Sequence, residues 1–89
     1  MTNYETKIFA AQLRDDLPTL DLHGMYPDEA IDKLELFLFD NFDKNNDIVI
    51  KIIYGGGTGK LGDKVRGYLK NHNITKEVVK EFGSCLVII

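Results

Sequence analysis

The sequence predicts an α/β fold, specifically an α+β two-layer sandwich in which two helices lie on a four-stranded mixed sheet in the order βαβαββ. Two observations favour it: strand-like apolar runs alternate with amphipathic helical runs, and two consecutive apolar runs close the chain. A chain of 89 residues has room for one core only. We therefore expect one domain over residues 18–89, preceded by an arm or short helix over residues 1–17.

The first strand and the longest helix follow from side-chain alternation and helix-start signals. Residues 19–23 (TLDLH) alternate polar and apolar side chains, as a strand with one covered face does, and Gly24 ends the run. Pro27 suits the first turn of a helix, which we expect to continue to about residue 42. Leu36 and Phe39 lie off the core side of this helix and are expected to contact the arm or a partner. The predicted core stripe comprises Ala30, Ile31, Leu34, Phe37, Leu38 and Asn41.

The second half of the chain predicts a strand, a helix and a hairpin. Residues 48–54 (IVIKIIY) form an apolar strand, and a glycine-rich loop over residues 55–60 leads into a helix of residues 61 to about 71. The hairpin is predicted from Val78–Phe82 and Cys85–Ile89, with Gly83-Ser84 as a tight turn that has glycine first. Cys85 is the single cysteine, and its apolar neighbours predict a buried, inert thiol.

The connections between these elements predict where the loops lie. Two βαβ passages make right-handed crossovers, so the first two strands run parallel and the loops that follow them open at the same edge of the sheet. The loop of residues 23–26 and the glycine loop then share one crevice, which is where open α/β sheets bind ligands.

Charge is distributed unevenly along the chain. The net charge is −3, but residues 1–43 carry 3 basic and 10 acidic side chains, whereas residues 44–89 carry 8 basic and 4 acidic ones. Local charge decides where a phosphate backbone can lie, so the second half is compatible with a nucleic-acid partner; a solvated lysine surface explains the same pattern. The sequence has no signal-peptide core and no stretch of the roughly 20 apolar residues that span a bilayer, so we expect a cytoplasmic protein without a membrane partner.

Asp21 and His23 are the candidate catalytic residues. They lie two apart on a strand, so both project from the face opposite Leu20 and Leu22. His23 can donate or accept a proton near neutral pH, and Asp21 can orient it, activate water or hold a divalent metal ion. The alternative is that both are solvated polar positions on an uncovered face.

The loop of residues 55–60 (GGGTGK) is a candidate phosphate cradle. Its four glycines let backbone amides approach an anion, Thr58 adds a hydroxyl, Lys60 adds a positive charge, and the following helix adds its dipole. The loop is not a P-loop, because that pattern requires glycine in place of Tyr54 and Ser or Thr in place of Leu61. Hydrolysis of a nucleoside triphosphate is therefore not expected.

A second glycine pattern overlaps this loop. Gly57, Gly59 and Gly62 have the G-x-G-x-x-G spacing of a dinucleotide fold. A dinucleotide needs two such halves, and this chain has room for little more than one. A tight turn with close packing of helix on strand explains the same glycines without a ligand.

Together these motifs resemble the Smr (small MutS-related) domain. The similarity rests on LDLHG at residues 20–24, DEA at 28–30, IIYGGGTGKL at 52–61 and VR at 65–66, and it runs from about Leu17 to the end of the chain. The resemblance implies a nucleic-acid partner, either DNA or RNA, and a hydrolase activity that nicks DNA or cleaves RNA. Asp21 and His23 map onto the Asp-x-His motif of the family.

The chain departs from the family pattern at Tyr54, where the second motif usually begins with histidine. A phenol ionises near 10, so Tyr54 cannot shuttle protons near neutral pH, but it can stack on a base or hydrogen-bond to a phosphate. Strand parity gives another interpretation, because Tyr54 shares a face with Ile50 and Ile52 and then belongs to the core. If the family's nuclease activity depends on that histidine, this chain binds without cutting.

Three hypotheses follow. The first is a nicking endonuclease, structure-selective or nonspecific, in which Asp21 and His23 are catalytic. The second is a non-catalytic module that binds DNA or RNA, and the third is a protein-interaction domain that uses Leu36 and Phe39. The requirement for a divalent metal ion as cofactor, the protein partner and the oligomeric state stay open. The residues predicted to bind nucleic acid are Tyr54, Gly55, Gly57, Thr58, Gly59, Lys60, Lys64 and Arg66.

Overall fold

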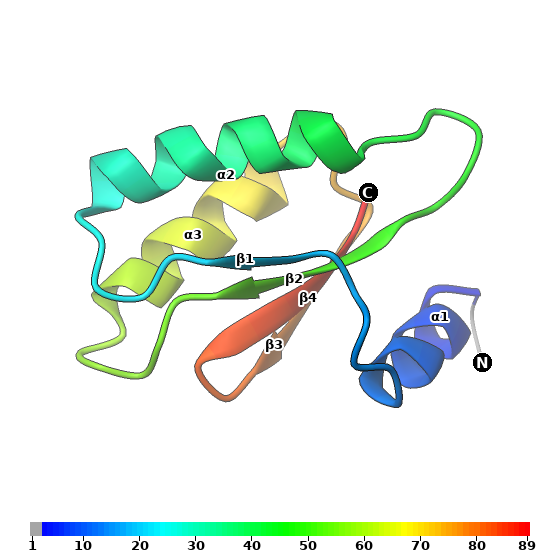
Figure 1. Cartoon of the computed structure of the whole chain (residues 1–89), viewed down its shortest axis with the longest axis horizontal. Coiled ribbons are helices and arrows are strands. Elements are labelled where there is room, and N and C mark those ends of the chain that lie inside the picture. The colour runs from blue at the N-terminus through cyan, green and yellow to red at the C-terminus, as the bar shows by residue number, and fades with distance from the viewer. Residues whose placement is uncertain (1–2) are drawn as a thin grey trace.

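Three helices and four strands make up the computed structural model, which describes residues 3–89; residues 1 and 2 of the predicted arm lie outside the described residues. Figure 1 shows α2 and α3 on one face of the sheet and α1 on the opposite side, at one end. The predicted α+β sandwich is confirmed, with one more helix before the βαβαββ order. The elements are α1 (Asn3–Gln12), β1 (Thr19–Asp21), α2 (Pro27–Asn41), β2 (Val49–Ile53), α3 (Lys60–Asn71), β3 (Glu77–Glu81) and β4 (Ser84–Ile88).

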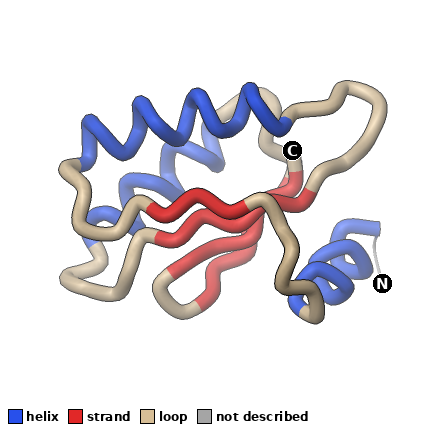
Figure 2. The backbone as a smooth tube through the Cα atoms, in the orientation of Figure 1, coloured by secondary structure: helices blue, strands red, loops and turns tan. Residues whose placement is uncertain are grey.

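The strands are ordered β1-β2-β4-β3 in one mixed sheet. β1 pairs with β2 in parallel, with Asp21 opposite Ile53, as the sequence predicts. β4 lies between β2 and β3 and is antiparallel to both, so the second βαβ passage joins strands that are parallel but not adjacent. The ends of β1 and β2 and the β3–β4 turn therefore lie at one edge, where Figure 2 shows the three loops together.

Two apolar clusters hold the sheet between helices. On one face, α2 and α3 cover Ile50 and Ile52. On the other face, Ile8 and Ala11 of α1 pack against Leu86 and Ile88. Because successive side chains point to opposite faces, β4 is buried on both sides along its whole length. The fully buried helix residues that face the first cluster are Ala30, Leu34, Leu38, Val65 and Leu69.

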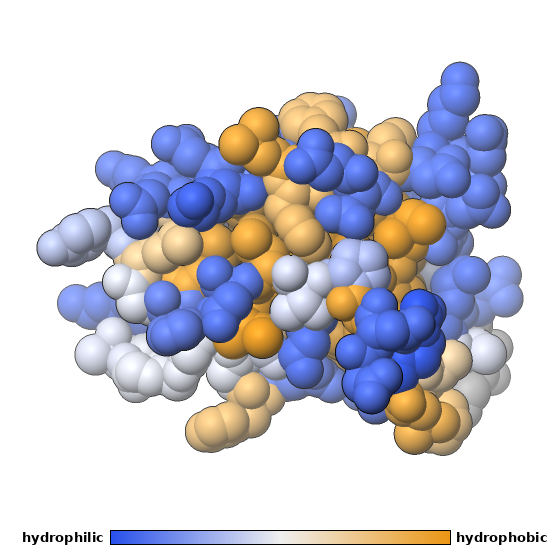
Figure 3. Space-filling view, viewed as in Figure 1, coloured by the Kyte–Doolittle hydropathy of each residue, from blue (hydrophilic) through white to orange (hydrophobic). Residues whose placement is uncertain are grey.

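Leu36 and Phe39 lie on the exposed side of α2. They are 66% and 62% exposed, and the predicted contact with the N-terminal arm is wrong because α1 packs on the opposite face of the sheet. The ring of Phe39 meets His72 edge-on, with 6.4 Å between the ring centroids. No helix of residues 3–89 has the length and apolar character needed to cross a membrane. On the face drawn in Figure 3, apolar residues emerge in the band between α2 and the sheet, among hydrophilic surroundings.

The β3–β4 turn lies one residue earlier than predicted. Glu81 pairs with Ser84, so the turn residues are Phe82 and Gly83 rather than Gly83 and Ser84. Gly83 has a φ of 68°, a left-handed conformation that glycine adopts without a steric penalty, and so glycine takes the second turn position rather than the first. Phe82 consequently leaves the predicted strand and is 98% exposed at the turn.

The substitutions Leu34→Ala and Leu36→Ala test which side of α2 is buried. Leu34 is fully buried, whereas Leu36 is 66% exposed. Lost burial and the cavity left behind should lower the free energy of unfolding of L34A by about 2–5 kcal/mol, and L36A should stay within about 0.5 kcal/mol of the native chain. Urea denaturation followed by circular dichroism measures both variants. Equal losses would mean that α2 faces the sheet with another side.

Candidate functional site

The loops that follow β1 and β2 meet at one edge of the sheet. The amide of Leu22 donates to the carbonyl oxygen of Ile53 at 2.7 Å, which continues the parallel pairing beyond the end of β1. A Cβ atom built on Gly55 would lie 3.5 Å from the Cβ of His23. A hollow of about 300 Å³ lies between the loops, with Tyr26, Gly57 and Thr58 in its wall. The crevice that the topology predicts is therefore present.

Asp21 and His23 form a hydrogen-bonded pair beside this crevice. Nδ1 of His23 lies 2.6 Å from Oδ1 of Asp21, and the backbone amide of His23 donates to the same oxygen at 3.0 Å. The hydrogen bond from His23 holds the pKa of Asp21 below its usual range, so the carboxyl group is ionised at neutral pH. An ionised carboxylate only accepts hydrogen bonds, so Nδ1 carries a proton and Nε2 is the nitrogen available to a substrate.

This pair is open to solvent. The side chains of His23 and Asp21 are 72% and 49% exposed. Leu22 lies between them in the chain and is fully buried, so the two polar side chains are held on the outer face by the packing of their neighbour. His23 directly precedes Gly24, a residue of the wall of the hollow, and its Cβ atom faces Gly55, another residue of that wall.

The glycine loop offers backbone amides to an anion. Gly55, Gly57 and Gly59 have φ values of 81°, 45° and 85°, and Gly59 caps the N-terminus of α3. Within residues 3–89, the amides of Gly57 and Thr58 have no acceptor, and both residues are exposed. Lys60 is exposed at the first position of α3. Exposed backbone amides at a helix N-terminus are groups that hydrogen-bond to anions in other proteins.

Tyr54 takes the buried position that strand parity predicts. It is 6% exposed, and burial raises the pKa of its phenol. Its hydroxyl donates to the carbonyl oxygen of Ser84 at 2.7 Å and accepts a hydrogen bond from Nη1 of Arg66 at 2.7 Å. The hydroxyl thus joins β2, β4 and α3, and the ring is not available to stack on a base.

The two basic residues of α3 that the sequence predicts to bind nucleic acid, Lys64 and Arg66, have different surroundings in the structure. Arg66 binds Oδ1 of Asp63 at 2.6 Å as well as Tyr54, and only 13% of its side chain is exposed. Lys64 is exposed but lines a different hollow, together with Tyr68 of α3 and His72, the residue that caps the C-terminus of α3. The structure therefore brings the Asp21–His23 pair next to Gly55, whereas Arg66 is bonded to Tyr54 and Lys64 lines another hollow.

The sequence predicts the place of Tyr26 in the crevice but no role for it, and it does not predict the contact of the β3–β4 turn with the glycine loop. Tyr26 is 81% exposed and lines the hollow immediately before Pro27, the residue that signals the start of α2. The turn of Phe82 and Gly83 packs on Gly55, because the oxygen of Gly83 accepts the amides of Tyr54 and Gly55. The signal for Tyr26 was its place in the loop after the first predicted strand.

Comparison with known families agrees with this geometry. A family model described as the Smr domain matches residues 20–85. The chain belongs to the Smr domain family. The match begins in β1 and ends in β4, so it includes Asp21, His23 and the glycine loop and leaves α1 outside. Comparison with curated proteins gives no match.

The described residues do not form a metal site built from protein ligands alone. Across residues 3–89, no group of three or more His, Cys, Asp and Glu side chains is arranged to hold one. Asp21 and His23 supply one carboxylate and one imidazole, and the Nδ1 atom of that imidazole is already bonded to the carboxylate. Zn²⁺ and Ca²⁺ sites use more protein donors than this, whereas Mg²⁺ is usually held by one or two carboxylates together with water and substrate phosphates.

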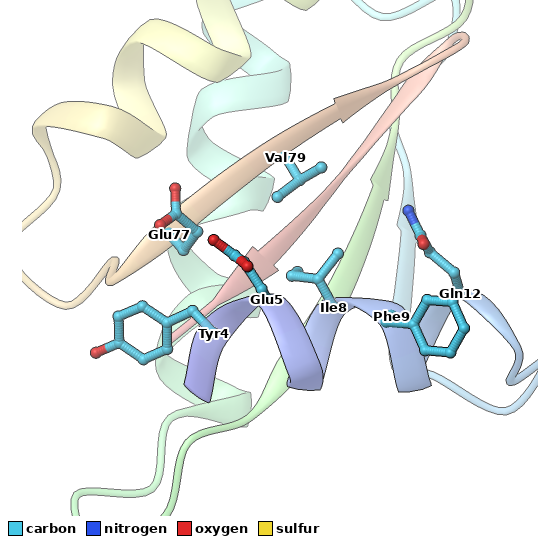
Figure 4. Close-up of a pocket in the computed structure, with 7 residues that line it drawn as sticks. All are labelled: Tyr4, Glu5, Ile8, Phe9, Gln12, Glu77 and Val79. Carbon is cyan, nitrogen blue, oxygen red and sulfur yellow. The ribbon is translucent and has the colours of Figure 1, made fainter. Parts of the chain in front are cut away.

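A second hollow lies on the opposite face of the sheet, where α1 meets the Smr domain. It has a volume of about 590 Å³ and is formed between α1 and β3 (Figure 4). None of the predicted site residues belongs to it. The residues that line it are Tyr4, Glu5, Ile8, Phe9, Gln12, Glu77 and Val79. The chemistry expected at the glycine loop is therefore spatially separate from this larger groove.

The substitutions Gly62→Ala and Gly67→Ala separate packing from helix propensity within α3. A Cβ atom on Gly62 would lie 2.7 Å from Cε1 of Tyr54, whereas one on Gly67 would have nothing within 4 Å. Alanine should raise the free energy of unfolding by up to about 1 kcal/mol at residue 67 and lower it by about 1–3 kcal/mol at residue 62. Chemical denaturation measures both changes. Stabilisation by both substitutions would contradict the position of Tyr54.

Proposed function

We propose that this Smr domain binds nucleic acid at the crevice between the two loops and cleaves a phosphodiester there, as a nicking endonuclease. The family supports a nucleic-acid-binding domain. The observation that carries the proposal is the hydrogen-bonded Asp21–His23 pair next to Gly55, the first residue of the glycine loop that lines the hollow. A proton-transfer group and a phosphate cradle then serve the same substrate.

Binding is electrostatic and uses the backbone. A phosphate in the hollow accepts hydrogen bonds from the amides of Gly57 and Thr58, and the N-terminus of α3 and Lys60 contribute positive charge. These contacts are made to the phosphate and not to a base edge, so they do not select a sequence.

Cleavage needs one base, and His23 supplies it. Nε2 of His23 takes a proton from the nucleophile. On DNA the nucleophile is water, and on RNA it is either water or the adjacent 2′-hydroxyl. The attacking oxygen bonds to phosphorus, the bond from phosphorus to the leaving oxygen breaks, and that oxygen takes a proton from solvent. Asp21 holds the ring through Nδ1 and stabilises the imidazolium that forms. The imidazolium then returns its proton to solvent.

Tyr54 replaces the histidine with which the family's second motif usually begins, so one proton carrier fewer is available in this chain. The histidine usual at this position would be a second proton carrier, but the buried phenol of Tyr54 is bonded to Ser84 and Arg66. The proposed chemistry therefore depends on His23 alone, and a binding module that does not cut is the outcome if one histidine is insufficient.

A supercoiled-plasmid nicking assay and a labelled-RNA cleavage assay test the chemistry. His23→Ala should lower the cleavage rate about 10²- to 10⁴-fold, Asp21→Asn should also lower it, and both variants should keep their affinity. Lys60→Ala should weaken binding and reduce by about 1 the slope of the logarithm of the binding constant against the logarithm of salt concentration. Lys44→Ala is the matched control, at an exposed lysine in the loop before β2, and it should change neither quantity.

Each contrary result removes a specific part of the proposal. Equal cutting by the native chain, His23→Ala and Asp21→Asn would reveal a contaminating nuclease. Binding without cutting by any of them would leave the non-catalytic module. Absence of binding to both DNA and RNA would overturn the proposal as a whole.

A further inference from the structure

The β3–β4 turn holds an exposed aromatic ring beside the glycine loop. The oxygen of Gly83 accepts the amides of Tyr54 and Gly55 at 3.1 and 2.9 Å, so the turn is fixed against the loop by two hydrogen bonds. A Cβ atom on Gly83 would lie 3.6 Å from the carbonyl carbon of Gly55. Phe82 is the other turn residue, and at 98% it is the most exposed large apolar residue of the described chain.

Neither packing nor turn chemistry explains this phenylalanine. Phe82 belongs to neither apolar cluster, so its ring forgoes the stabilisation that burial gives. Residues favoured at tight turns are Gly, Asn, Asp, Ser and Pro, each for a reason that a phenyl ring does not share. A large ring kept in water on a turn that is itself firmly anchored points to a ligand for the ring.

A second exposed ring lies on the other side of the cradle. Tyr26 is 81% exposed and lines the hollow with Gly57 and Thr58. The loop after β1, the loop after β2 and the β3–β4 turn follow one another across the sheet at one end of the molecule (Figure 1). Because neighbouring strands are about 4.8 Å apart, the end of β3, which Phe82 follows, lies about 10 Å from the end of β2 and about 14 Å from the end of β1.

We propose that Phe82 and Tyr26 are base-stacking positions and that the site takes unpaired nucleotides, as single-stranded DNA or RNA. This inference rests on the proposed function, because it places a phosphate of the same strand on the glycine loop. Bases within a duplex stack on one another and present only their edges, whereas the bases of a single strand offer their faces to aromatic side chains. One phosphate in the cradle brings the bases on either side within reach of the two rings.

Binding to short labelled strands tests the two positions by fluorescence anisotropy. Phe82→Ala should weaken binding of a single strand about 12 nucleotides long by about five-fold to 150-fold, and Tyr26→Ala should act in the same direction. Phe9→Ala is the matched control, because Phe9 is also exposed, at 58%, but lies on α1 on the opposite face. It should leave the affinity within two-fold, as should Phe82→Ala when the strand is abasic.

A fluorescent reporter gives a second readout of contact. The chain has no tryptophan, so Phe82→Trp places a single indole at the turn and Phe9→Trp places one on α1 as the control. Single-stranded DNA and single-stranded RNA, titrated separately, should quench the indole fluorescence of the Phe82→Trp variant but not that of the Phe9→Trp variant. A duplex of the same length and an abasic strand should quench neither.

The outcomes separate this inference from the one it rests on. If no strand binds, the nucleic-acid function and the stacking positions fail together. If single strands bind in a manner that Lys60→Ala weakens, while Phe82→Ala and Phe9→Ala bind equally and the turn indole is not quenched, only the stacking positions are overturned. Stronger binding of the duplex than of either single strand would also contradict the inference.

Discussion

The parallel pairing of β1 with β2 is the constraint on which the whole site depends. Asp21 lies opposite Ile53, so the two strands end at the same edge and His23 comes next to Gly55. Side chains alternate along a strand, and a register shift of one residue would turn the acid and the imidazole into the core and expose Leu22. The burial of Leu22 therefore does more than fill the core, because it fixes the outward direction of both candidate catalytic groups.

A second set of contacts fixes the other side of the site. The hydroxyl of Tyr54 is bonded to Ser84 and Arg66, and the absence of a side chain at Gly62 leaves room for its ring. Where the family pattern usually has a histidine, this chain has a residue that ties two strands to a helix. The glycine loop that follows is consequently held at its start by the core, while the amides of Gly57 and Thr58 remain exposed.

Local patterns predicted most of the fold because they report which side of each element is buried. Alternation placed Asp21 and His23 together, and parity placed Tyr54 in the core. The turn was predicted one residue late, since either position puts Gly83 in a two-residue turn and only the pairing of Glu81 with Ser84 decides between them. The burial of Arg66 could not be predicted from the sequence, because it depends on a hydrogen bond to Tyr54 that only the tertiary structure provides.

The proposed site requires the two loops to bind one ligand together, and an NMR titration of the native chain with a short single-stranded oligonucleotide measures this most directly. The amides of His23, Gly57 and Thr58 should shift together and give one dissociation constant. Shifts clustered along the groove between α1 and β3 would contradict this requirement. Different dissociation constants for the two loops would contradict it equally.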